Sequence, residues 1–155
     1  MRKKAWLIAA IILVVGMALA GPQAALARQG GGTGTLTASG DGLAGLRGDG
    51  TIVISGAGVL WIRDHAGDAS IEVSGQGVRR ESPGGWIRYI GFDGEATVSG
   101  SAVTVALSGV NIDLEATGTG HFVLRGQGEY SVSGPDGTVL LEGTWTEEAR
   151  VIELP

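Results

Sequence analysis

The chain has 155 residues, enough for one domain of ordinary size but not for two. It contains no cysteine, which excludes disulfides, thiol catalysis and cysteine–zinc sites. Its formal net charge is −5, and its two lysines, Lys3 and Lys4, lie at the N-terminus. An acidic domain without lysine excludes Schiff-base and P-loop lysine chemistry. It also repels nucleic acid, so we expect no nucleic-acid partner.

Residues 1–27 have the pattern of a secretory signal peptide. Three basic residues at 2–4 precede an apolar run over 5–20, and small residues suit cleavage after Ala20 or Ala27. As a helix the run spans roughly 24 Å, short of the roughly 30 Å hydrocarbon core, which favours cleavage over an uncleaved membrane anchor. Cleavage after Ala27 leaves 8 of the 11 basic residues beside all 16 acidic ones, a net charge of about −8. We expect an exported protein that is secreted, periplasmic or on the cell surface, with membrane contact only through this segment if it stays uncleaved.

The remainder divides into a flexible glycine-rich lead-in over 28–34 and one all-β domain over 35–155. Short runs in this domain alternate apolar and polar residues, which is typical of strands with one buried and one wet face. The pattern predicts about 10 to 12 short strands, which include 51–55, 59–63, 70–74, 86–90, 95–99, 102–108, 111–116, 121–125, 129–133, 138–142 and 150–154.

Glycines separate these runs, and from Gly100 onward they recur every 8 or 9 residues. A strand of about five residues and a turn of about three give this spacing, because glycine accepts the positive φ of turns. Two architectures fit equally well. One is a β-solenoid or β-roll, in which short strands stack along an axis. The other is an antiparallel β-sandwich or barrel.

Segments 98–101, 107–109 and 118–120 contain short Ser-Gly and Gly-Thr-Gly motifs between the strand-like runs. In this respect the chain resembles bacterial adhesin-type domains with short glycine-rich β-repeats, of the head-GIN type, over about residues 50–143. The resemblance implies a β-solenoid and a role in the cell envelope, and it brings no catalytic residues.

The best candidate for ligand binding is a set of aromatic and basic residues. Trp61 shares a strand face with Arg63, Trp86 shares one with Arg88, and Tyr89 follows directly. Guanidinium groups stack on indole rings, so these residues form a binding surface if their face is exposed. If the face is buried, the tryptophans belong to the core, which the large apolar area of the indole ring favours.

Histidines and carboxylates form no catalytic or metal-binding motif. We interpret His65 and His121 as ordinary loop and surface residues. Asp41 and Asp49 each lie in a Gly-Asp-Gly tripeptide, but the aspartates of a calcium-binding β-roll are missing, so we interpret them as solvated turn residues. We expect no catalytic residue, no metal and no cofactor.

The expected function is that of an exported, non-enzymatic cell-envelope protein with a structural or adhesive role. The alternative is a module that binds a cell-wall glycan or an envelope protein through exposed Trp and Arg side chains. An enzyme is the least expected class. Exposure of Trp61 and Trp86 distinguishes the first two, because a binding platform has to lie on the surface.

Overall fold

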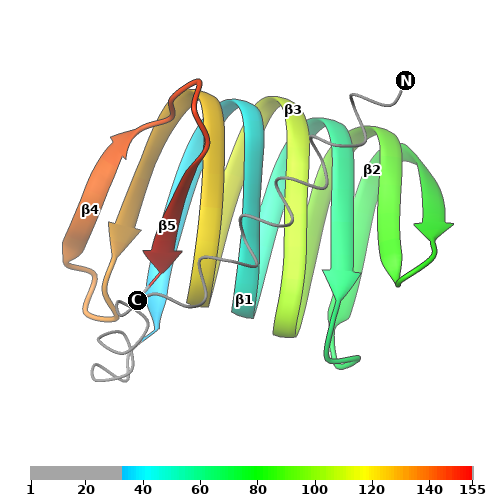
Figure 1. Cartoon of the computed structure of the whole chain (residues 1–155), viewed down its shortest axis with the longest axis horizontal. Coiled ribbons are helices and arrows are strands. Elements are labelled where there is room, and N and C mark those ends of the chain that lie inside the picture. The colour runs from blue at the N-terminus through cyan, green and yellow to red at the C-terminus, as the bar shows by residue number, and fades with distance from the viewer. Residues whose placement is uncertain (1–32, 155) are drawn as a thin grey trace. The chain divides into compact units, whose positions relative to one another are not determined.

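The computed structural model describes residues 33–154, in which every regular element is a β-strand (Figure 1). The strands are β1 (Gly34–Asp64), β2 (Ser70–Ser82), β3 (Trp86–Ser133), β4 (Val139–Thr144) and β5 (Arg150–Leu154). The all-β prediction is confirmed for this part of the chain. The expected signal helix and most of the lead-in lie outside the described residues. Within residues 33–154 we find no helix with the length and apolarity to cross a membrane.

The five strands form one antiparallel sheet that remains open. β3 is its centre and pairs with each of the other four strands. β2 forms one edge, and β4 and β5 form the other. β1 and β3 wind around each other, so that Thr51 of β1 has Ser99 of β3 on one side and Thr117 of β3 on the other. Because the sheet does not close, the barrel is not the architecture of this protein.

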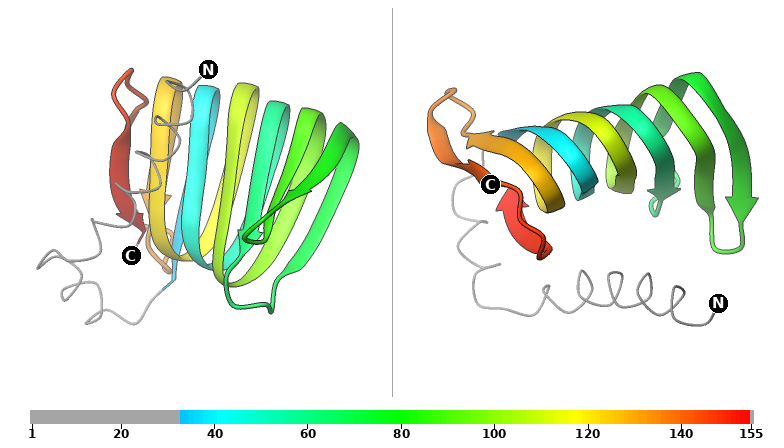
Figure 2. Two further views of the ribbon diagram at one scale, coloured as in Figure 1. Left: turned by 45° about the vertical axis from the view of Figure 1, so that its right-hand side comes forward. Right: turned by 90° about the horizontal axis from the view of Figure 1, so that it is seen from above.

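The sheet folds back on itself at glycine corners and forms two layers (Figures 1 and 2). In β1, for example, residues 35–39 lie in the first layer and residues 43–47 in the second. Layer 1 contains, in order across the sheet, residues 139–144, 129–133, 35–39, 112–117, 51–55, 95–99 and 70–74. Layer 2 contains, in the same order, residues 150–154, 121–125, 43–47, 103–108, 59–63, 86–90 and 78–82.

These straight segments match the short runs expected from the sequence, but they are not separate strands. The prediction of 10 to 12 strands broken by turns is wrong, because the glycine corners continue the hydrogen-bonded ladder instead of ending it. At one corner Gly48 lies opposite Gly120, and a Cβ built on Gly48 would lie 1.9 Å from the carbonyl oxygen of Thr119. Only glycine lets the two backbones turn together at this distance. The chain therefore winds along an axis, as in a solenoid, while its strands pair antiparallel, as in a sandwich.

One hydrophobic core fills the space between the layers. Ile52 and Ile54 enter it from layer 1, and Leu60 and Ile62 enter it from layer 2; all four are fully buried. The predicted inward parity is confirmed for Val103, Val105, Leu107, Ile112 and Leu114. No charged or polar side chain is buried among residues 33–154. The strands and the core of the described residues belong to one compact unit, which we call the folding unit.

Candidate functional site

Trp61 and Trp86 lie on the outer face of layer 2 and are half-buried there. The two neighbours of Trp61, Leu60 and Ile62, are fully buried, which turns the intervening side chain outward. Ile87 packs against the core, which turns Trp86 outward for the same reason. The interpretation of these two tryptophans as core residues is therefore wrong.

The outer face brings both tryptophans together with two arginines. Trp61 lies directly opposite Arg88, and Arg63 lies directly opposite Trp86. The indole rings meet edge to face, with their centroids 6.2 Å apart. The guanidinium carbon of Arg88 lies 4.9 Å from the centre of the Trp61 ring, and that of Arg63 lies 5.5 Å from the centre of the Trp86 ring. We call these four residues the Trp/Arg cluster. The negative faces of the rings hold both cations in place.

Tyr89 does not join the Trp/Arg cluster. It follows Arg88 in a strand, so its side chain points to the opposite side of the layer. There it packs against the core, and its ring lies edge to face with that of Phe92 at a centroid distance of 6.3 Å. Four of the five residues expected to bind a ligand thus share one surface, and the fifth supports that surface from inside.

Three further arginines extend the basic character of this surface. Arg80 lies directly opposite Arg88 on β2. Arg47 and Arg125 each follow a buried leucine and therefore point outward. We call the outer face of layer 2 the Arg/Trp face. These three residues were not predicted to belong to the site. Strand parity indicates that Arg47 and Arg125 point outward, but only the pairing of distant segments shows that they share one face.

Carboxylates do not neutralise the Arg/Trp face. Among the outward residues of layer 2, Glu153 is the acidic one, and it lies opposite His121. In the part of the chain that the structure describes, the one ion pair joins Arg79 and Glu81, at 2.6 Å on edge strand β2. The Nε atom of Arg88 is buried without a hydrogen-bond partner. The guanidinium groups of the Trp/Arg cluster are therefore stacked on rings but have no anionic partner.

His65 lies at the rim of this face and responds to its charge. Its Nε2 atom is 3.0 Å from the hydroxyl oxygen of Thr104. Partial burial lowers the pKa of His65, and the positive charges of Arg47 and Arg63 lower it further, against the smaller effect of Asp64. Burial and the two neighbouring guanidinium groups thus both disfavour the charged form of the imidazole.

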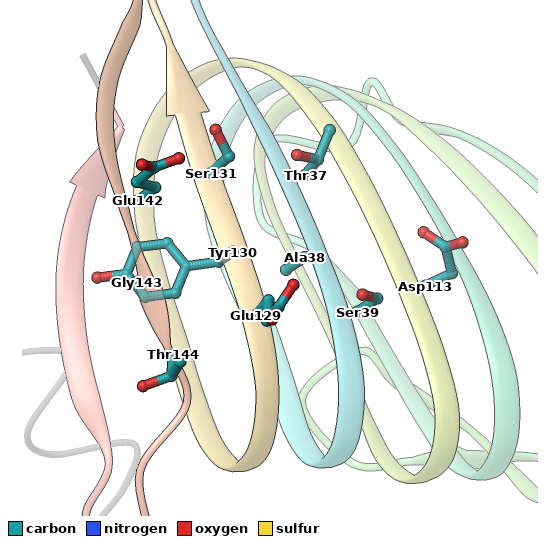
Figure 3. Close-up of a pocket in the computed structure, with 10 residues that line it drawn as sticks. All are labelled: Thr37, Ala38, Ser39, Asp113, Glu129, Tyr130, Ser131, Glu142, Gly143 and Thr144. Carbon is teal, nitrogen blue, oxygen red and sulfur yellow. The ribbon is translucent and has the colours of Figure 1, made fainter.

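The outer face of layer 1 has the opposite character. Its outward positions carry hydroxyl and carboxyl groups, and its acidic residues are Glu72, Glu95, Asp113, Glu115, Glu129 and Glu142. A shallow, open hollow of about 530 Å³ lies on this side, between residues 35–39 and β4. Figure 3 shows Asp113 and Glu129 on strands to either side of Ser39, with the ring of Tyr130 beside Gly143. No histidine or arginine lines the hollow.

The described residues contain no group of histidine and carboxylate side chains that is arranged to hold a metal ion. Asp41 and Asp49, expected as solvated turn residues, are exposed at glycine corners, and each also holds a neighbouring corner of the sheet. Asp49 accepts a hydrogen bond from the backbone N–H of Ala102 at 2.6 Å, and Asp41 accepts one from Asn111 at 2.7 Å. Ala102 and Asn111 have φ values of 47° and 52°, so each aspartate stabilises a left-handed residue that is not glycine.

No protein-family model matches the chain, and neither a curated protein nor a solved structure matches it. The resemblance to head-GIN adhesin-type domains therefore stays a prediction.

Proposed function

We propose that the protein is an exported, non-enzymatic binding module that attaches to an anionic glycan of the cell envelope through its Arg/Trp face. The observation that carries this proposal is that the guanidinium groups of Arg63 and Arg88 are held in place but unpaired. Both guanidinium groups are fixed against indole rings on an outward surface, and neither has a carboxylate partner in the described part of the chain. The proposal thereby assigns the adhesive role expected from the sequence to one surface, the Arg/Trp face.

The ligand chemistry follows from what the arginines present. A guanidinium group that stacks on a ring keeps its N–H groups in a fixed plane, and these bind carboxylate, sulfate or phosphate oxygens in a bidentate manner. The stacked arrangement also reduces the side-chain entropy that binding would otherwise cost. An anionic polymer suits the face better than a compact ion does, because Arg47, Arg80 and Arg125 extend the positive charge across several strands.

The tryptophans have a second role in this proposal. Each ring already offers one face to a guanidinium group, so it is not a free platform for a neutral sugar. The rings instead orient the cations and add apolar contact for the carbon atoms of a sugar ring. The proposal therefore favours an acidic glycan over the neutral cell-wall glycan that an aromatic platform alone would bind.

The test is a binding measurement with residues 28–155, which contain the whole folding unit. The probes are polygalacturonate, a neutral glucan of similar length and a single-stranded oligonucleotide. We expect binding to polygalacturonate that weakens as salt increases, and much weaker binding to the other two. Arg63→Gln and Arg88→Gln should each weaken polygalacturonate binding about tenfold, the usual loss for one charged hydrogen-bonding group.

Arg150→Gln is the matched control, because Arg150 lies opposite buried Leu124 and so belongs to the inner side of the layer. It should bind like the wild type. Equal binding to the neutral glucan, or unchanged binding in both Arg63→Gln and Arg88→Gln, would refute the proposed role of the arginines. Equal binding to the oligonucleotide would refute the assignment to a glycan.

A further inference from the structure

Edge strand β2 has one partner only. Its residues pair with β3 along the whole strand, from Ser70 opposite Ser99 to Ser82 opposite Trp86. The other side of β2 faces no strand within the described residues, and most of its residues are exposed. β2 also belongs to both layers, because residues 70–74 and 78–82 are joined by the corner Gly75-Gln76-Gly77. An unpaired edge of this length is a template for another strand.

The interior of the sheet shows what fits beside such a corner. The corner Gly40-Asp41-Gly42 lies opposite Gly126-Gln127-Gly128, and Gly48-Asp49-Gly50 lies opposite Gly118-Thr119-Gly120. In both places the strands are antiparallel and the middle residues face each other, so a local two-fold axis relates the two corners. A Cβ built on any of these outer glycines would lie 1.9 to 2.2 Å from a backbone carbonyl oxygen of the facing strand. Two Gly-x-Gly corners can therefore face each other in register, while Gly56-Ala57-Gly58 shows that a corner of another sequence also fits beside one.

Within residues 34–154, the corner of β2 is the Gly-x-Gly corner that has no neighbouring backbone on one of its two sides. The corner at 126–128 has the same three residues, but hydrogen bonds from Gly126 to Thr146 and from Trp145 to Gly128 cover its outer side. A second Gly-x-Gly corner fits the free side of β2 in the way seen at residues 40–42 and 126–128. A second copy of β2 supplies such a corner on an exposed edge.

We propose that two copies of this protein pair through β2, antiparallel, with a two-fold axis that passes between the two Gln76 residues. Gly75 then faces Gly77 of the partner subunit, which repeats the pairing inside each copy. Layer 1 of one copy continues into layer 2 of the other. On the inner side, Ile71 and Val73 pack against their own core, and the register sets them opposite Glu81 and Arg79 of the partner subunit, which form an ion pair with each other.

The charges on β2 fit this register. With Gln76 on the axis, Glu72 faces Arg80 of the partner subunit, and the symmetry makes this pair twice. Glu72 points outward from layer 1, because it alternates with Ile71 and Val73, and Arg80 points outward from layer 2 opposite Arg88. Within one copy the two residues lie on different layers and form no ion pair. Opposite charges directly across an antiparallel pair favour that pairing and that register.

A single cysteine placed on the axis tests the geometry. The chain has no cysteine, so Gln76→Cys introduces a unique thiol. Facing residues of an antiparallel pair have Cα atoms about 4.5 to 5.5 Å apart, which lies within the range of a disulfide. We expect Gln76→Cys to oxidise to a covalent dimer. Gln127→Cys is the matched control, with the same residue in the same tripeptide on a covered corner, and should stay monomeric.

Sedimentation equilibrium of residues 28–155 tests the wild type and the ion pairs. We expect the wild type to have twice the mass of the chain, and Glu72→Arg or Arg80→Glu to raise the dissociation constant about tenfold. The double variant should restore the wild-type constant, and Glu115→Arg, in the same layer but away from the edge, should leave it unchanged.

A wild type that remains monomeric at hundreds of micromolar would overturn the proposal. So would cross-linking of Gln127→Cys as readily as Gln76→Cys, or a dimer that both single charge changes leave intact. The inference does not rest on the proposed glycan binding. Its experiments contain no glycan, so either proposal can fail without the other.

Discussion

Replacement of a single corner glycine should destabilise the fold more than replacement of a loop glycine with a similarly unusual backbone. Gly50 has a φ of 140°, and a Cβ built on it would lie 2.1 Å from the carbonyl oxygen of Thr117 and 2.8 Å from the Cα of Gly118. Gly67 has a φ of 79°, but a Cβ there would meet nothing within 4 Å. Gly67→Ala therefore shows the cost of a positive φ without any close contact, and Gly50→Ala combines the cost of its own, larger φ with that of separating two paired strands.

The conformational cost of a left-handed alanine is about 1 to 2 kcal/mol. Forcing extra atoms into a packed site adds about 1 to 3 kcal/mol or more. We therefore expect Gly67→Ala to lower the free energy of unfolding by about 1 to 2 kcal/mol and Gly50→Ala by about 2 to 5 kcal/mol, a large share of the 5 to 15 kcal/mol typical of a domain.

Urea denaturation monitored by tryptophan fluorescence measures both values, at one protein concentration and with the slope of the transition compared between variants. If Gly50→Ala costs no more than Gly67→Ala, the paired glycine corners do not hold the two layers together, and the reasoning about the corners is wrong.

Three further predictions concern single side chains. Asp49→Ala should lower the free energy of unfolding by about 1 to 3 kcal/mol in the same denaturation assay, because the backbone N–H of Ala102 loses a charged acceptor. Trp145→Ala should cost about 3 to 5 kcal/mol, since the ring is buried and its Nε1 donates to the Glu129 carbonyl oxygen, whereas Trp61→Ala on the outer face should cost less. Backbone N–H groups, first that of Ala69, lower the pKa of Asp64 below 3.8, so its contribution to stability is complete above about pH 4 and is lost as the pH falls through its folded pKa. Denaturation between pH 2 and 6 should therefore show a smaller acid-induced loss of stability for Asp64→Asn than for the wild type.

Strand content and side-chain parity could be predicted from the sequence because both are local. The alternation around Ile112 and Leu114 fixes which side chains face the core, and it requires no knowledge of the partner strand. Glycine spacing likewise located the corners. The same spacing did not show that the ladder continues through them, because that depends on a second glycine that faces the first from a distant part of the chain, as Gly120 faces Gly48.

At the candidate site, too, the local features were predictable from the sequence and the features that depend on strand pairing were not. Alternation placed Trp61 with Arg63, and Trp86 with Arg88, but it did not decide whether those faces are buried. The decision comes from pairing: Trp61 faces Arg88, and Arg63 faces Trp86, so each ring has a cation as its neighbour on the same surface. Cross-strand contacts of this kind join residues more than 20 positions apart and leave no periodic signal in the sequence.

Net charge likewise does not show how charge is distributed over the two faces. A total of −5 suggests a surface that repels anions, yet the structure separates the charges by layer. Outward carboxylates gather on layer 1, and outward arginines gather on layer 2. At physiological ionic strength charges are screened over about 8 Å, so a polymer close to one face is influenced mainly by that face and little by the total. An acidic chain can therefore bind an anionic partner, and pairing through β2 would set the basic face of one copy beside the acidic face of the next.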